Sequence, residues 1–174
     1  LIDGVLLNRC ALDVRLGRRI PMEVNVGQAT PVQGTFAAEG TTIYMGLPNV
    51  LCATNFKTGR QKWAAFLEDP KGGELEARTR HRVKGSPAVH GGRAYLGSLD
   101  GTLYAFETAE GKPLWTFKTG GEIWSSPAVT PDGTVYVASR DRKIYAIDAK
   151  TGAKLWEFAT EGAVDSSPCL ADGA

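Results

Sequence analysis

Short runs of alternating hydrophobic and polar residues, separated by glycine-containing turns, recur along most of the chain. In the clearest stretch these runs cover Ser126–Val129, Thr134–Ala138, Lys143–Asp148 and Lys154–Phe158. Alternation with a period of two is typical of strands with one buried face, and Val, Ile, Tyr, Trp and Phe favour strands. No segment keeps a helical period over ten residues. The pattern predicts an all-β chain built from four-stranded antiparallel units.

The same pattern repeats about every 40 residues. VKGSPAVHGGRAYLGSLDGTLYAFETAEGKPLW at 83–115 matches IWSSPAVTPDGTVYVASRDRKIYAIDAKTGAKLW at 123–156. A further copy begins with SSPCLADG near the C-terminal end, and ALDVRLGRRIP at 11–21 matches AIDAKTGAKLW. A looser copy runs from 29 to 66 and keeps Pro31, Tyr44, Gly59 and Trp63. A four-stranded unit of this length is the size of one β-propeller blade.

The repeats resemble those of the pyrroloquinoline-quinone (PQQ) type, or quinoprotein-like, β-propeller family. The resemblance rests on Ser-Pro-Ala-Val, Asp-Gly-Thr-Val-Tyr, Tyr-Ala-Ile-Asp-Ala-Lys-Thr-Gly and Lys-Leu-Trp-Glu-Phe, and it is strongest in 83–160. The Gly-x-x-Leu-Trp segment is similar to the tryptophan-docking motif of that family. The resemblance therefore implies that Trp63, Trp115 and Trp156 pack onto the neighbouring blade, where we expect Trp115 and Trp156 to be largely buried.

The repeats predict a single propeller domain over 1–174 with four blade-equivalents. Their approximate bounds are 163–174 together with 1–24, then 25–66, 83–120 and 121–162. Three arrangements fit: a closed four-bladed ring, two chains forming an eight-bladed ring, or part of a longer chain. The resemblance favours the last two, because PQQ-type propellers generally have seven or eight blades. In a homodimer, the strand around Pro168 is expected to pair in trans with Val5–Cys10.

Residues 67–82, LEDPKGGELEARTRHR, depart from the repeat. They are charged, rich in glycine and without a strand pattern, which predicts an extended inter-blade loop. The loop contains a basic cluster of Arg78, Arg80, His81 and Arg82. Two interpretations stay open: a solvated loop, or a loop that docks a partner, since long loops on rigid scaffolds often carry function.

One position within the repeat differs in every unit. The residue three before each repeat proline is Gln28, Lys84, Trp124 and Asp165. This position precedes the first strand, which is innermost in propellers, so the four side chains are expected to ring one mouth of the central channel. The position is either a binding site or merely an unconstrained exposed one. Trp124 is the strongest candidate, because an exposed tryptophan can stack on a ligand or anchor a partner.

Composition and motifs narrow the function. The chain has 20 Lys and Arg against 19 Asp and Glu, a net charge of +1, which argues against nucleic-acid binding. No apolar run approaches ~20 residues, so no membrane span is predicted. Cys10, Cys52 and Cys169 form no CxxC pair and are interpreted as small buried hydrophobes. No catalytic motif is present, and no catalytic residue, cofactor ligand or metal ligand is predicted.

The resemblance implies a non-catalytic binding scaffold, because the repeat is kept while the features of the quinone site are not. Non-enzymatic members of this kind include outer-membrane assembly lipoproteins and bacterial sensor or surface domains. A protein partner and a periplasmic or extracellular location in a bacterium are therefore expected. One alternative is a segment of a PQQ-dependent quinoprotein dehydrogenase, which would use PQQ and calcium. The other is a carbohydrate-binding surface module, which only Trp124 indicates.

Overall fold

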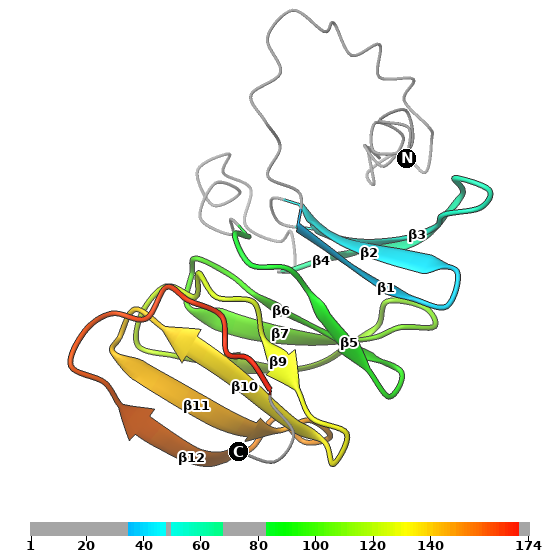
Figure 1. The fold of residues 1–174 in the computed structure, drawn as a ribbon. Coiled ribbons are helices and arrows are strands. Elements are labelled where there is room, and N and C mark those ends of the chain that lie inside the picture. Colours follow the sequence, from blue (N-terminus) through cyan, green and yellow to red (C-terminus); the bar gives the residue numbers. More distant parts are fainter. Residues whose placement is uncertain (1–34, 48–49, 68–82, 171–174) are drawn as a thin grey trace, which may run out of the picture.

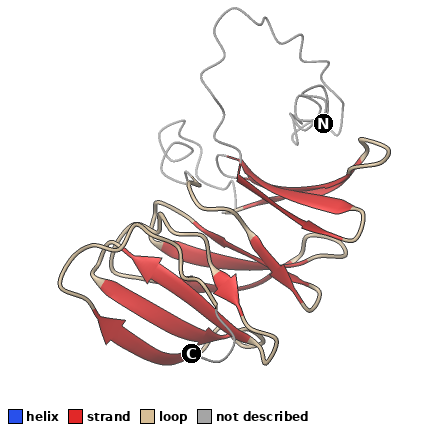
Figure 2. Ribbon diagram, in the orientation of Figure 1, coloured by secondary structure: helices blue, strands red, loops and turns tan. Residues whose placement is uncertain are grey.

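All regular elements in the described part of the chain are strands. The computed structural model describes residues 35–47, 50–67 and 83–170, and no helix occurs in these ranges (Figure 2). The first sheet contains β1 (Thr35–Glu39), β2 (Thr42–Leu47), β3 (Val50–Asn55) and β4 (Gln61–Phe66). The second contains β5 (Ala88–His90), β6 (Arg93–Gly97), β7 (Thr102–Glu107) and β8 (Pro113–Lys118). The third contains β9 (Ala128–Val129), β10 (Thr134–Ser139), β11 (Lys143–Asp148) and β12 (Lys154–Ala159).

Each sheet is an antiparallel meander whose strand order follows the sequence. The first strands of the three sheets are neighbours, because β5 contacts both β1 and β9. The sheets are thus arranged as successive blades, and they do not close into a ring (Figure 1). The prediction of an all-β propeller with four-stranded antiparallel blades is confirmed. Most of the predicted fourth unit, 163–174 with 1–24, lies outside the described residues.

Two hydrophobic clusters fill the spaces between successive blades. In the first, Leu51 and Trp63 of the first blade pack with Leu96 and Phe106 of the second. The second cluster joins the second and third blades and includes Tyr95, Leu103, Val135, Val137 and Ile147. Period-two alternation places these side chains on the blade faces. Their burial away from water is the main free-energy contribution that holds the blades together.

Tryptophans at the ends of the first two blades are fastened to the next blade. The Trp63 indole nitrogen donates to the Thr108 carbonyl at 2.8 Å, and the Trp115 indole nitrogen donates to the Ala149 carbonyl at 3.1 Å. Each indole also lies against a glycine in the turn that accepts its hydrogen bond, Gly111 for Trp63 and Gly152 for Trp115. A Cβ built on Gly111 would be 2.5 Å from the Trp63 ring. Gly111 also has a φ of 75°, a left-handed conformation that favours glycine.

Trp156 is exposed, whereas the sequence predicts that it is buried. Its side chain is 47% exposed, whereas Trp63 is 9% exposed and Trp115 is half-buried. The neighbouring β12 side chains Leu155 and Phe158 are exposed as well. The repeat register identifies a docking position, but burial there needs the turn of a following blade. No such turn lies on Trp156 among the described residues.

Strand pairing corrects the repeat register in the first blade. Ala37 pairs with Tyr44 as Ala88 pairs with Tyr95, so Phe36 occupies the place of Pro87. The sequence repeat predicts Pro31 at that place, which is wrong by five residues, because strand pairing and not the proline sets the register there. Gln28 is therefore not the equivalent of Lys84. It lies outside the described residues.

Two smaller corrections concern single residues. Leu67, the first residue of the predicted inter-blade loop, is buried in the first hydrophobic cluster, so the departure from the blade begins after it. Cys52 is buried as expected, but Cys169 is exposed. Cys10 lies outside the described residues.

Candidate functional site

The segments that lead into the inner strands run side by side across the blade boundaries. The Ser86 N–H donates to the Ser126 hydroxyl oxygen at 2.8 Å, and the Ser126 N–H donates to the Ser167 hydroxyl oxygen at 2.8 Å. The same serine of successive repeats is thus linked from blade to blade. Lys84, Trp124 and Asp165 each stand two residues before one of these serines, so the serine links hold them in a row.

Lys84 lies directly on the side chain of the next blade. Its ammonium nitrogen is 3.2 Å from the centroid of the Trp124 ring, which is cation–π geometry. The Trp124 indole is half-buried and Lys84 is exposed. The pair therefore joins two repeats at a surface that solvent reaches.

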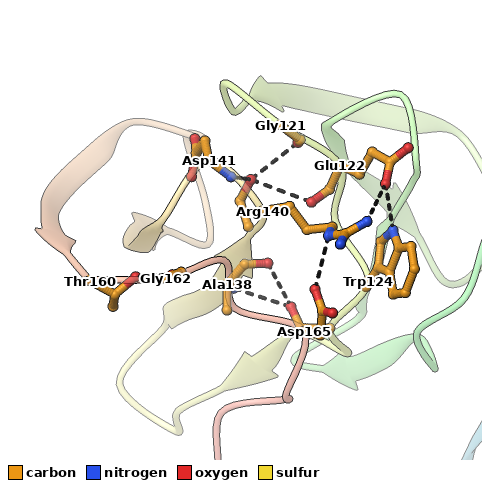
Figure 3. A network of polar contacts seen from close by, with 11 residues as sticks. Gly121, Glu122, Trp124, Ala138, Arg140, Asp141, Thr160, Gly162 and Asp165 are labelled. Carbon is orange, nitrogen blue, oxygen red and sulfur yellow. Dashed lines mark hydrogen bonds and ion pairs between the residues drawn. The ribbon is translucent and has the colours of Figure 1, made fainter.

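Trp124 and Asp165 are connected through Arg140. The Trp124 indole nitrogen donates to Oε2 of Glu122 at 2.8 Å, and Nη1 of Arg140 lies 3.3 Å from the same oxygen (Figure 3). The Arg140 Nε lies 3.2 Å from Oδ1 of Asp165. The guanidinium carbon of Arg140 is also 4.1 Å from the centroid of the Trp124 ring. We call Lys84, Glu122, Trp124, Arg140 and Asp165 the mouth cluster.

Buried hydrogen bonds fix the backbone beneath the mouth cluster. The Ser125 hydroxyl donates to the Ala138 carbonyl at 2.9 Å, and the Ser139 hydroxyl lies 3.1 Å from the Gly121 carbonyl oxygen (Figure 3). Both serines are fully buried. These bonds tie the segment that carries Trp124 to the end of β10. The indole is therefore presented from a rigid backbone and oriented by the carboxylate of Glu122.

Stability alone is a weak explanation for the mouth cluster. The side chains of Glu122, Arg140 and Asp165 keep 46%, 39% and 49% of their surface exposed. Ion pairs between exposed side chains typically contribute only about 0–1 kcal/mol, because water and salt screen them. An aromatic ring surrounded by oriented charges at an accessible position has the features of a binding surface.

The structure brings together three of the four residues predicted for this site, Lys84, Trp124 and Asp165. Sequence reasoning missed Glu122 and Arg140. The sequence contained a signal for Arg140, which lies in the predicted turn between the second and third strands of its blade. In a meander, that turn lies at the end of the blade where the first strand begins. The predicted partner loop residues Arg78, Arg80, His81 and Arg82 lie outside the described residues, as does Gln28.

The described residues contain no candidate metal site. Within residues 35–47, 50–67 and 83–170, no three His, Cys, Asp or Glu side chains are grouped as metal ligands would be. In the same ranges, no helix is long and apolar enough to cross a membrane.

Comparison with known proteins identifies the repeat. A family model described as outer membrane protein assembly factor BamB matches residues 9–118 and 99–174. Outer membrane protein assembly factor BamB of Salmonella typhimurium is 32% identical over 81 residues, which are 47% of this chain and 20% of that protein. The chain thus spans about a fifth of the length of the curated relatives that it matches.

Solved structures show the same fold. BamB from Moraxella catarrhalis is similar with a TM-score of 0.65 at 20% identity, covering 80% of this chain and 40% of that one. A europium-containing methanol dehydrogenase gives a TM-score of 0.58 at 23% identity, covering 74% of this chain and 24% of that one. The family assignment rests on three findings: the blades, the docked tryptophans and a family model that matches more than half of the sequence. The chain belongs to the family of PQQ-type propeller repeats described as outer membrane protein assembly factor BamB.

Proposed function

We propose that this chain is a non-catalytic scaffold that binds another protein through the mouth cluster. The observation that carries the proposal is the Trp124 indole, which is half-buried, held by Glu122 and flanked by Lys84 and Arg140. Tryptophan and arginine are the residue types that most often dominate the energy of protein interfaces. A side chain already held in one orientation loses little conformational entropy when a partner binds.

Family membership supports an assembly role. The curated relatives are named outer membrane protein assembly factors, and we propose a corresponding role at the outer membrane for this chain, with a periplasmic or extracellular location. The basic residues Arg78, Arg80, His81 and Arg82 remain a predicted second contact with the partner. They precede Lys84 closely in the sequence.

Site-specific photo-crosslinking tests the scaffold role. A photoreactive amino acid at Ser166, an exposed residue next to Asp165, should form an adduct with a protein of the outer-membrane assembly machinery, identified by mass spectrometry. The same group at Thr151, an exposed turn position away from the mouth cluster, is the control. The Ser166 adduct should disappear in the Trp124→Ala variant. Equal adducts at both positions, or an adduct that survives Trp124→Ala, would contradict binding at this site.

The two alternatives, a segment of a PQQ-dependent dehydrogenase and a carbohydrate-binding module, can be distinguished from the scaffold by what the chain binds. The likeness to the methanol dehydrogenase is below 25% identity and shows the fold alone. Titration with PQQ and calcium separates the dehydrogenase from the scaffold, since stoichiometric quinone binding would favour the enzyme. Binding to a glycan array that is lost with Trp124→Ala would favour the carbohydrate-binding module.

An eight-bladed ring made of two chains stays a prediction. It would cover the exposed Trp156 with a blade from a second copy. Native mass spectrometry at micromolar concentration tests it, because a dimer has twice the 18.6 kDa of one chain. A folded monomer at that concentration would rule the two-chain ring out.

A further inference from the structure

We propose that Arg142 is a further partner-binding residue of this chain, outside the mouth cluster. Its guanidinium donates to oxygen acceptors of the same partner protein that Trp124 contacts. This inference rests on the scaffold role proposed above and extends the binding surface by one residue to which neither the repeat nor the mouth cluster points.

Arg142 has a left-handed backbone conformation, which favours glycine. Its φ is 67°, and no other non-glycine residue in the described part of the chain has a positive φ. Because Ser139 pairs with Lys143, residues 140–142 form a three-residue hairpin loop between β10 and β11. The last residue of such a loop is typically left-handed. Gly101, with a φ of 84°, takes this place one blade earlier. The third blade thus has arginine where glycine would form the same loop with less strain.

Hydrogen bonds around the loop hold it in this shape. The Asp141 carboxylate accepts from the Gly120 N–H at 2.7 Å and from the Tyr145 hydroxyl at 2.5 Å. The Arg142 carbonyl accepts from the Thr160 N–H at 2.8 Å. A strained conformation persists only where the surrounding structure determines it, and such positions cluster at functional sites. The Arg142 backbone is therefore fixed by contacts on both sides of its loop.

The side chain of Arg142 contributes no polar contact to the described fold. It is exposed, and it forms no hydrogen bond or ion pair with another described residue. The carboxylate of Glu157 on the adjacent strand β12 is already paired with Lys143 and Lys154. Arginine at this place thus costs the fold strain without a compensating bond. Its five guanidinium donors stay available for a partner, and arginine is among the residue types that most often dominate interface energy.

Arg142 is close enough to the mouth cluster to belong to the same interface. Its loop also carries Arg140, whose guanidinium carbon is 4.1 Å from the centroid of the Trp124 ring (Figure 3). The Cα atoms of two residues at positions i and i+2 are separated by at most about 7 Å. A protein interface of standard size covers about 800 Å² on each partner, a patch roughly 30 Å across. An interface centred on Trp124 therefore extends to Arg142.

The test combines stability with crosslinking to the partner. Each Arg142 variant is made in the 174-residue chain that carries the photoreactive amino acid at Ser166, and the yield of the identified adduct is compared. Arg142→Gly and Arg142→Asn both remove the guanidinium and suit the left-handed backbone. Both should unfold at a higher urea concentration than the wild type, yet give at least about fivefold less adduct. Arg142→Lys keeps the strain and the charge, and it should give more adduct than Arg142→Gly.

Two controls make the test specific. Lys150→Asn removes an exposed cation from the turn at the other end of β11 and should leave the adduct yield unchanged. The indole N–H signal of Trp124 in the nitrogen–proton correlation spectrum, assigned with Trp124→Phe, separates a contact from a positioning effect. This signal should stay in place in Arg142→Gly, because Arg142 acts on the partner and not on the mouth cluster.

The outcomes separate this inference from the scaffold role. An unchanged adduct yield in Arg142→Gly, or an equal loss in Lys150→Asn, would overturn the role of Arg142. A shifted Trp124 signal or an unraised urea midpoint in Arg142→Gly would overturn it as well. An adduct that requires Trp124 but not Arg142 would leave the scaffold role standing. No adduct in the wild type would overturn the scaffold role and this contact with it.

Discussion

The indole nitrogen of Trp115 donates a hydrogen bond to the main-chain carbonyl of Ala149 at 3.1 Å, which fastens the last strand of one blade to a turn of the next. The ring of Trp115 lies against Gly152 in that turn. Trp63 makes the same pair of contacts with Thr108 and Gly111 one blade earlier. Each blade thus contributes a tryptophan on one side and a glycine turn on the other, and both are needed for the interface.

Replacing Gly152 by alanine should destabilise the chain more than the same change at Gly91. A Cβ at Gly152 would be 2.7 Å from the Trp115 ring, whereas nothing lies within 4 Å of a Cβ at Gly91. Both glycines have positive φ, 74° and 58°, so both variants carry the backbone cost of about 1–2 kcal/mol. Overpacking should add about 1–3 kcal/mol at Gly152 alone. Urea unfolding measures the difference, and equal losses would show that the close approach is not needed.

Truncation of the tryptophans should follow their burial. Trp63→Ala should lower the free energy of unfolding by about 3–5 kcal/mol, as for other large buried side chains. Trp156→Ala should cost less than half as much, because 47% of its side-chain surface stays in water. Chemical denaturation of the two variants tests this. If Trp156→Ala were as costly as Trp63→Ala, a further blade or a second chain would have to cover Trp156 in solution.

The serine links between repeats should contribute measurably to stability. Ser126→Ala removes the hydroxyl that accepts the Ser86 N–H at 2.8 Å, and the half-buried amide then lacks its partner. Leaving such a donor unpaired should cost about 1–3 kcal/mol. Ser86→Ala is the control, because the same residue of the repeat is changed there without removing this acceptor. A smaller loss for Ser126→Ala than for Ser86→Ala would contradict the assigned hydrogen bond.

Stability should fall in acid through Asp100. Burial disfavours its charged form, but hydrogen bonds from the Thr102 N–H and the Tyr104 hydroxyl, with the charge of Lys118, outweigh burial and hold the pKa of Asp100 below its usual value. A carboxylate with a lowered folded-state pKa contributes stability above its unfolded pKa of about 4, and this contribution is lost as the pH falls through the folded-state value.

The Asp100→Asn variant isolates this effect. At pH 7 it should be less stable than the wild type, and the gap should narrow as the pH falls below about 4. Urea midpoints along a pH series give the measurement. Asp132→Asn, at an exposed turn, is the control. A gap that stays constant from pH 7 into the acid range would show that the Asp100 charge does not act on stability.

The described strands could be predicted from the sequence because each depends on local pattern. The expected runs at Thr134–Ala138, Lys143–Asp148 and Lys154–Phe158 each end one residue or less from the observed strands. Period-two alternation and glycine turns determine a meander without reference to distant residues. The error at Pro31 has the opposite origin. Where the repeat is loose, strand pairing and not the proline sets the register, and Ala37 pairs with Tyr44.

The all-β blades, their number of strands and the variable position that holds Lys84, Trp124 and Asp165 follow from local sequence pattern. What these three residues contact depends on how the chain folds back on itself. Arg140 reaches Trp124 and Asp165 because a blade turn folds back to the end where the inner strands begin, a placement that linear spacing does not display. Burial likewise depends on neighbours. Trp63 and Trp156 occupy the same place in their repeats, yet only Trp63 has a following blade in the described structure to cover it.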